Sequence, residues 1–312
     1  MTLEETLQLV NPLVDAGVDA LHISAGIGET KHLISPPSCT PEAWLSDAAR
    51  QVKEAVRNRV PVISVGRYVH PAIADQVIRD GKADMVAFGR ALIAEPELIN
   101  KYAENRLDSV RVCLGCNEGC TGMLNECRPI SCALNPRTGY EDDYPMTQAD
   151  APKAVVVIGG GPAGCEAALT AAQRGHKVVL FEATSTLGGL ANIAALPPGK
   201  GVFATLGTYF STMLPRAGVD VRLNTKADAD AVRALKPGEA AAVRYSSYAL
   251  MMLVRLDPLD ADTLDSLRAQ ALSDMKSGEL QDSIQSYGAQ LPHALDSAAM
   301  KKMPASKIKN EQ

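Results

Sequence analysis

Residues 154–183 read AVVVIGGGPAGCEAALTAAQRGHKVVLFEA, and they give the clearest indication of fold in this sequence. An apolar run at 154–158 precedes a glycine turn, and an alanine-rich stretch then leads to a second apolar run at 178–181. Short apolar runs bounded by glycine are typical of buried strands. The order strand, helix, strand predicts two parallel strands joined by a crossover helix.

The turn GGGPAG (159–164) has the G-x-G-x-x-G spacing. Its first glycine allows a tight turn, its second lets a pyrophosphate approach the backbone, and its third lets the helix pack closely on the strand. The N-terminus of the helix attracts the anion, and an acidic residue at the end of the next strand accepts hydrogen bonds from a ribose hydroxyl. The predicted dinucleotide-binding residues are Gly159, Gly161, Pro162, Ala163, Gly164 and Glu182.

Upstream of this unit, residues 113–132 read CLGCNEGCTGMLNECRPISC and contain five of the chain's seven cysteines. The start of the chain, MTLEETLQLV, lacks the basic residues and apolar run of a signal peptide, and no long apolar run predicts a membrane span. We therefore predict a cytoplasmic protein. Disulfides are disfavoured in that compartment, so the clustered cysteines are predicted to be metal ligands.

The spacing Cys113-x2-Cys116-x3-Cys120-x11-Cys132 supplies four thiolates for the four irons of a [4Fe–4S] cluster, and its short intervals would let one loop provide three of them. Zinc also accepts four thiolates, but structural zinc sites usually pair two C-x2-C knuckles, and only one is present. Cys127 is surplus and could replace Cys132 as the fourth ligand. The spacing favours iron–sulfur over zinc and leaves the fourth ligand open.

Residues 3–99 alternate amphipathic helices, predicted near 3–16, 41–57 and 71–80, with apolar strands predicted at 19–24, 60–66 and 83–89. This alternation predicts parallel strands that are buried on both faces, with His22 inside the first strand as a core side chain. Two strands end in a glycine and an arginine, Gly66-Arg67 and Gly89-Arg90. Glycine lets backbone N–H groups approach a phosphate, and arginine adds a bidentate charged fork. Phosphate is often bound at this end of the strands in a β/α barrel.

Taken together, residues 1 to about 235 resemble the NADH:flavin oxidoreductase family related to old yellow enzyme, in its branch with 2,4-dienoyl-CoA reductase and trimethylamine dehydrogenase. The resemblance implies an FMN-binding TIM (β/α)8 barrel, in which the FMN would be bound by Gly66, Arg67, Gly89 and Arg90. It also implies a [4Fe–4S] site whose ligands are Cys113, Cys116, Cys120 and Cys132. An FAD-binding fold would follow. The motif LGGLAN (187–192) resembles the second FAD loop of the family, which adds Gly189. Leu190 stands where the family usually has glutamine. The catalytic histidine of close relatives would align with Thr30, whereas His32 lies two residues further on.

The predicted fold class is α/β. The expected parts are the last three units of the barrel (1–110), the cysteine segment and linker (111–152), the start of a Rossmann-like FAD-binding domain (153–239) and a mostly helical tail (240–312) that lies outside the family. In the tail, a strand is predicted at 248–256 and a long helix at 260–288.

The resemblance implies an NAD(P)H-dependent oxidoreductase that reduces the activated C=C bond of a small enone or enoyl substrate. Two alternatives stay open: a non-catalytic remnant that binds at most a cluster or ADP, and a binding or foldase-like module in the tail. The net charge of −5 without a basic stripe argues against nucleic acid as a partner. Three strands of a barrel would leave unpaired edges, so self-association is expected. For this chain alone we also expect weak FMN binding or none, and no enone reduction.

Overall fold

The structure, a computed structural model, describes residues 2–235 and 239–242. The chain divides into two units, residues 1–255 and 256–312, and every element described below belongs to the first. The strand and helix predicted at 248–256 and 260–288 lie outside the described residues.

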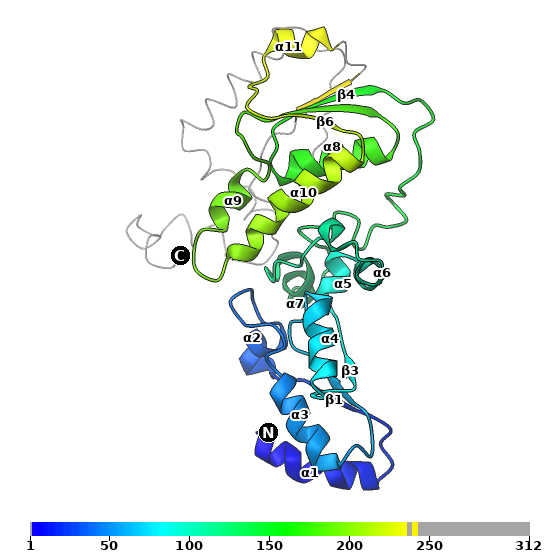
Figure 1. The fold of residues 1–312 in the computed structure, drawn as a ribbon, viewed down its shortest axis with the longest axis vertical. Helices are drawn as coiled ribbons and strands as arrows, with labels where there is room; N and C mark the ends of the chain where they lie inside the picture. The colour runs from blue at the N-terminus through cyan, green and yellow to red at the C-terminus, as the bar shows by residue number, and fades with distance from the viewer. Residues whose placement is uncertain (1, 236–238, 243–312) are drawn as a thin grey trace. The chain divides into compact units, whose positions relative to one another are not determined.

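The first sheet contains three parallel strands in the order β1-β2-β3, as the alternating pattern predicts (Figure 1). The strands are β1 (Leu21–Ile23), β2 (Val62–Ser64) and β3 (Met85–Val86). Their register pairs Leu21 with Val62 and Ile63 with Met85.

Three amphipathic helices accompany this sheet, α1 (Leu3–Asp15), α3 (Ser46–Val56) and α4 (Pro71–Arg79). Helix α1 begins with a capping box, in which the side chains of Thr2 and Glu5 each accept a hydrogen bond from the other residue's backbone N–H. Helix α3 begins at Ser46 and not at the predicted Pro41, since residues 41–45 form turns and Ala43 has a φ of +57°. Its fully buried residues Ala49, Val52 and Val56 recur at helical spacing and join a core with Val62 and Val77.

The prediction that His22 is a core side chain is wrong. His22 lies in β1 as expected, but it is exposed, while its neighbour Leu21 is buried. Successive side chains of a strand point to opposite faces, and the helices cover only one of them. Met85 of β3 is also exposed, so within the part of the chain that the structure describes this sheet is not buried on both faces as predicted.

Two short elements lie in the connection between β1 and α3, the 3-10 turn η1 (Gly28–Thr30) and α2 (Lys31–Ile34). Further short elements follow β3 and lead through the cysteine segment toward the second sheet: α5 (Arg90–Ala94), α6 (Leu98–Ala103), the 3-10 turn η2 (Leu107–Ser109), a π-helical turn η3 (Glu118–Gly122) and α7 (Met123–Asn125).

The second sheet contains four parallel strands in the order β6-β5-β4-β7. The strands are β4 (Ala154–Ile158), β5 (Lys177–Phe181), β6 (Asp220–Arg222) and β7 (Glu239–Ala242). Because β7 pairs with β4 along its whole length, the sheet extends three residues beyond the predicted boundary at residue 239.

Helices cover both faces of the second sheet. The alternate strand residues Val155 and Val157 pack with α8 (Pro162–Gln173) and α10 (Thr205–Arg216), which lie side by side in Figure 1. Val156, between them, packs with Val232 of α11 (Ala229–Ala234) on the opposite face. Two short helices precede α10, α9 (Leu190–Ala194) and the 3-10 turn η4 (Gly201–Ala204). Cys165 in α8 is fully buried and packs in this core.

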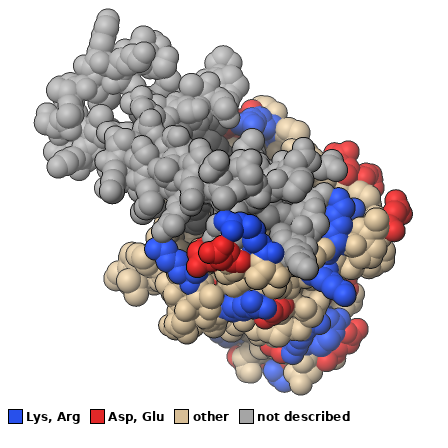
Figure 2. Space-filling view, turned by 90° about the horizontal axis from the view of Figure 1, so that it is seen from above, with Lys and Arg blue, Asp and Glu red and all other residues tan. Residues whose placement is uncertain are grey.

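Acidic and basic side chains alternate on the face of the molecule shown in Figure 2. This distribution agrees with the absence of a basic stripe in the sequence. No helix in residues 2–235 and 239–242 is both long enough and apolar enough to span a bilayer.

Candidate functional site

The four cysteines predicted as cluster ligands line one small cavity, of about 20 Å³. They are Cys113, Cys116, Cys120 and Cys132. Cys127 does not line this cavity; it is exposed, with a φ of +55°. Of the two alternatives for the fourth ligand, the geometry therefore favours Cys132.

Each of the four sulfurs is close to a hydrogen-bond donor of its own segment. The backbone N–H of Leu134 donates to Cys132 Sγ over 3.4 Å, and the Thr121 hydroxyl is 3.9 Å from Cys120 Sγ. The N–H groups of Gly115 and Glu118 bond to the thiols of Cys113 and Cys116, respectively, and lower their pKa. Burial has the larger effect and raises the pKa of both thiols. Hydrogen bonds of this kind stabilise thiolates and tune the reduction potential of an iron–sulfur cluster.

The arrangement of the cysteines fits a cluster better than a single zinc ion. Four zinc ligands converge on one ion at Zn–S distances of about 2.3 Å, whereas the thiolates of a [4Fe–4S] cluster each bind a different iron. Among residues 2–235 and 239–242, no three His, Cys, Asp or Glu side chains converge as a single ion would require. The four thiols instead line one common cavity, so a group that binds each thiolate at a different metal ion accounts for all four of them.

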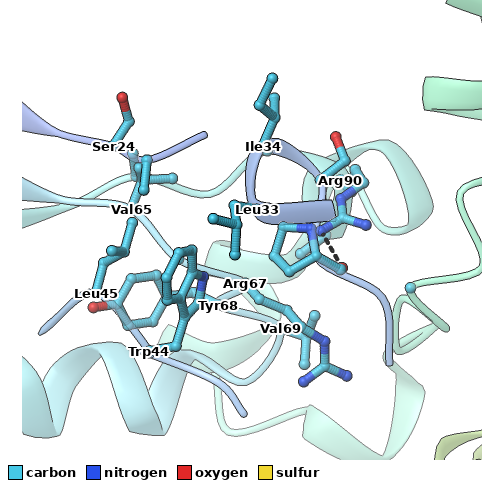
Figure 3. A pocket seen from close by; sticks show the side chains of 18 of the residues that line it. Ser24, Leu33, Ile34, Trp44, Leu45, Val65, Arg67, Tyr68, Val69 and Arg90 are labelled. Carbon is cyan, nitrogen blue, oxygen red and sulfur yellow. Dashed lines mark hydrogen bonds between the residues drawn. The ribbon is translucent and has the colours of Figure 1, made fainter. Parts of the chain in front are cut away.

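Both predicted Gly-Arg pairs line a second cavity of about 220 Å³ (Figure 3). Gly66 and Arg67 follow β2, and Gly89 and Arg90 lie where β3 leads into α5. A Cβ atom at Gly89 would have open space around it, so the backbone is accessible there. A Cβ atom at Gly66 would lie 3.2 Å from Trp44 Cδ1, which leaves little room for a side chain.

The two arginines are held by backbone carbonyl groups of residues 36–40. Arg67 Nη1 donates to the Thr40 carbonyl over 2.8 Å, and Arg90 Nη2 donates to the Pro36 carbonyl over 2.9 Å. Arg67 Nε is buried and has no hydrogen-bond partner among the described residues. A buried charged donor without a partner is costly, so, within the described ranges, Arg67 Nε is an unsatisfied group beside this cavity. The two arginines that line the cavity suit an anion such as a phosphate.

Two aromatic residues of this cavity were not predicted from the sequence, Trp44 and Tyr68 (Figure 3). Tyr68 is 3% exposed, and its hydroxyl lies 2.8 Å from the Ser64 hydroxyl. Trp44 Nε1 is buried and unpaired within the described part of the chain. Tyr68 directly follows the predicted Gly66-Arg67 pair, and this position could have indicated that it lies at the cavity. No local pattern indicates Trp44.

The glycine turn has the geometry expected of a G-x-G-x-x-G loop. Gly159 has a φ of +103°, and Gly161 caps the N-terminus of α8, in which Pro162 and Ala163 are the first two residues. A Cβ atom at Gly164 would lie only 2.0 Å from the Gly159 carbonyl oxygen. The third glycine therefore permits close contact between helix and strand.

Glu182 lies beside this turn and is hydrogen-bonded to it. One carboxylate oxygen accepts the Gly160 N–H over 2.6 Å, and the other accepts the N–H and hydroxyl of Thr184, each over 2.7 Å. Partial burial raises the pKa of Glu182, but the hydrogen bonds from Thr184 and Gly160 outweigh it and lower the pKa below its ordinary value. The charged carboxylate is thus held at the position that the sequence predicts for ribose binding.

The predicted second loop packs directly against the first. The Gly188 N–H donates to the Gly160 carbonyl over 2.8 Å, and a Cβ atom at Gly189 would lie 3.1 Å from Gly161 Cα. Gly189 has a φ of +50°. Leu190, in the usual position of glutamine, is 51% exposed and so does not fill a core position.

His32 is exposed in α2 and does not line the larger cavity, although its neighbours Leu33 and Ile34 do. The Thr30 hydroxyl accepts the Ile27 N–H over 2.9 Å and also lies outside the cavity. The structure therefore brings neither residue of this loop to the site.

These observations define a parallel α/β protein with a phosphate-type cavity, a four-cysteine cavity and a dinucleotide-type glycine turn. Residues 5–109 match the family model described as "NADH:flavin oxidoreductase / NADH oxidase family", and residues 154–218 match "FAD dependent oxidoreductase". The chain belongs to the NADH:flavin oxidoreductase family.

The relatives reported below are named as oxidases and reductases of different compounds. The chain is 43% identical over 239 residues to an NADH oxidase of Thermoanaerobacter brockii, covering 76% of this chain and 36% of the relative. It is 38% identical to a bilirubin reductase of Mediterraneibacter gnavus, covering 76% and 37%. Among solved structures, it is similar to a 2-naphthoyl-CoA reductase bound to 2-naphthoyl-CoA, with a TM-score of 0.74 and 28% identity, covering 78% of this chain and 37% of that one. The chain thus spans little more than a third of the length of these relatives.

Proposed function

We propose that this chain carries the cofactor-binding parts of an NAD(P)H-dependent flavin and iron–sulfur oxidoreductase of the enoate or 2,4-dienoyl-CoA reductase type. Its substrate would be a small enone or enoyl compound with an activated C=C bond. The names of its relatives, which include a bilirubin reductase and a 2-naphthoyl-CoA reductase, support this substrate class. We also propose that the protein is cytoplasmic, where clustered thiols stay reduced.

The observation that carries this proposal is that the two cavities adjoin. Cys113, Gly115 and Arg90 line both the four-cysteine cavity and the larger cavity with the Gly-Arg pairs. A cluster and a flavin held there would share these residues. Such proximity favours electron exchange between two bound redox groups.

Each part of the chain has its own role in this proposal. Residues 1–110 would be the barrel part that binds the FMN phosphate through Gly66, Arg67, Gly89 and Arg90. Residues 111–152 would hold the [4Fe–4S] cluster. Residues 153–239, with the sheet continuing to Ala242, would be the Rossmann-like part that binds FAD. Its strand order, with the first strand between the second and the fourth, is that of dinucleotide-binding folds. When bound, these groups would supply the electron and hydride transfer, while the protein positions them.

The test is cofactor content. The full chain, reconstituted anaerobically with iron and sulfide, should retain about four irons and four sulfides per chain, as a [4Fe–4S] cluster requires. The Cys113→Ser variant is the matched control and should retain far less of both. Stoichiometric zinc without sulfide in the purified protein would contradict the proposal.

A further inference from the structure

Arg90 and Asn117 join the phosphate-type cavity to the cysteine segment. The Arg90 Nη1 group donates a hydrogen bond to Asn117 Oδ1, although the two residues are 27 positions apart in the chain. Asn117 directly follows Cys116, and both Arg90 and Asn117 line the four-cysteine cavity. Arg90 also lines the larger cavity. One arginine therefore contacts both sites.

Both polar groups of the Asn117 side chain take part in this junction. Its amide oxygen accepts from Arg90, and its Nδ2 group donates to the Ser35 carbonyl over 2.7 Å. The backbone carbonyl of Asn117 accepts the Gly122 N–H over 2.7 Å, and this hydrogen bond closes the turn that contains Cys120. Asn117 has a φ of +62°, a conformation that asparagine and glycine tolerate better than other residues. It thus links the backbone around two predicted ligands to Arg90.

Residues 35–40 form a strap that connects the same groups. The Ser35 and Pro36 carbonyls bind Asn117 and Arg90, respectively, and the Ser35 hydroxyl accepts a hydrogen bond from Thr121 over 3.1 Å. The strap also packs on the knuckle between the first two cysteines, since a Cβ atom at Gly115 would lie 3.0 Å from the Ser38 nitrogen. A change in the position of the cysteine loop would therefore change the strap and Arg90 together.

We infer that Asn117 is a positioning residue that couples cluster loading to phosphate binding at Arg90, so that each strengthens the other. The inference rests on the proposed function. A cluster bound to the cysteines holds the loop in place, and the loop then presents Asn117 Oδ1 to Arg90. An arginine fork has five donors, and two of its nitrogens are oriented here by Asn117 and Pro36. The donors that remain are then pre-oriented for a phosphate, at no further cost in side-chain entropy.

Coupling between two binding sites is reciprocal. A ligand that binds Arg90 through its phosphate must therefore stabilise the cluster by the same factor as the cluster strengthens binding of that ligand. This makes the coupling measurable from the cluster side without any turnover.

The experiment brings the reconstituted full chain to equilibrium with increasing concentrations of an iron chelator, with saturating FMN, with riboflavin and with neither, and measures the chelator concentration that removes half of the iron. FMN should raise this concentration by about fivefold or more, the lower end of typical coupling factors. Riboflavin lacks the phosphate and should give little protection. Asn117→Gly removes both side-chain hydrogen bonds and keeps the left-handed backbone unstrained, so it should abolish the difference between FMN and riboflavin.

Asn105→Gly is the matched control. Asn105 is exposed and has a φ of +56°, so the substitution is the same in type and in backbone conformation but lies outside both cavities. This variant should keep the full effect of FMN. Arg90→Lys cannot reach both Asn117 and Pro36 with a planar fork, so it should lose the effect as Asn117→Gly does.

Equal iron loss with FMN and riboflavin in the unmodified chain, or an undiminished FMN effect in Asn117→Gly, would overturn the inference while leaving the proposed function intact. If the chain assembled no iron–sulfur cluster at all, the proposed function would fail, and the inference with it.

Discussion

At the scale of single residues, the hydrogen atom that serves as the side chain of Gly164 determines how closely α8 approaches β4. A methyl group there would lie 2.0 Å from the Gly159 carbonyl oxygen, well inside van der Waals contact. The obstructing atom belongs to the backbone of the glycine turn, so it cannot move aside as the end of a flexible side chain could.

We therefore expect Gly164→Ala to lower the free energy of unfolding by about 1–3 kcal/mol or more, the usual cost of overpacking. Denaturant titration of the full chain measures this. Gly201→Ala is the control, because a Cβ atom at Gly201 meets nothing within 4 Å and the residue has no positive φ. Equal stability of the two variants would show that α8 can shift away from the strand without loss.

The two candidates for the fourth cluster ligand also differ at this scale. Cys132 lines the cavity with the other three cysteines and accepts a hydrogen bond from Leu134, whereas Cys127 is exposed and does not line it. We expect Cys132→Ser to lose most of the iron and sulfide and Cys127→Ser to retain both. Colorimetric iron and sulfide analysis after anaerobic reconstitution distinguishes them. Retention in Cys132→Ser with loss in Cys127→Ser would reverse the assignment.

At the scale of elements, a carboxylate fastens the loop before α4 to the turn before α3. Glu42 Oε2 accepts the N–H groups of Val69 and His70 over 2.9 and 3.0 Å, and Glu42 Oε1 lies 2.6 Å from His70 Nδ1. The loop so held includes Arg67 and Tyr68, which line the larger cavity. The Glu42–His70 pair therefore supports the shape of that cavity from outside it.

The pair predicts a pH dependence of stability. The hydrogen bond with Glu42 raises the pKa of His70, against smaller opposing effects of burial and Arg67. Burial raises the pKa of Glu42, but its hydrogen bonds with His70 and Val69 outweigh burial and lower the pKa below its ordinary value. A histidine with a raised pKa contributes stability that is complete below its ordinary pKa of about 6.5 and is lost as the pH rises through the raised value. A carboxylate with a lowered pKa contributes stability that is complete above its ordinary pKa of about 4.3 and is lost as the pH falls through the lowered value.

The difference in stability between the unmodified chain and His70→Gln should therefore be largest between about pH 4.5 and 6.5 and should shrink as the pH rises further. Thermal unfolding of both proteins across this range measures the difference. Because His70 is half-exposed, solvent screens the pair and the effect should be modest. A difference that grows above neutral pH would contradict the assignment.

At the scale of the whole described molecule, a buried ion pair connects the segment that precedes the cysteines to the glycine-turn helix. Arg111 Nη2 donates to Glu166 Oε1 of α8 over 2.8 Å, and the two side chains are 17% and 11% exposed. The Arg111 guanidinium also lies 5.4 Å from the centre of the Tyr209 ring in α10. Asp108 and Arg216 form a second link between the same regions, but both side chains are about half-exposed.

These two links should differ strongly in their effect on stability. Arg111→Met leaves Glu166 buried without its partner, so we expect a loss of about 3–5 kcal/mol in the free energy of unfolding. The double variant Arg111→Met/Glu166→Gln removes the uncompensated charge and should recover much of this loss. Arg216→Gln at the exposed pair should have a much smaller effect, because water screens that pair. Denaturant titration of all three measures this order, and an equal loss for Arg111→Met and Arg216→Gln would contradict it.

Local patterns in the sequence were sufficient to predict the strands β1 to β5, the helices α1, α4 and α8, and the two glycine loops at 159–164 and 187–192. These features depend on the period of apolar residues and on glycine, and both act over a few neighbouring positions. The cysteine spacing likewise indicated a cluster, because one loop supplies three of the predicted ligands.

Contacts between distant segments were decided only by the tertiary structure. The sequence left Cys127 and Cys132 as alternatives, and only the folded segment brings Cys132 to the cavity of the other three. It placed His22 in the core, because an apolar strand pattern does not reveal which face the helices cover. It gave no reason to connect Arg90 with Asn117, or Trp44 with the Gly-Arg cavity, because a hydrogen bond or a cavity between residues tens of positions apart depends on how the whole chain packs.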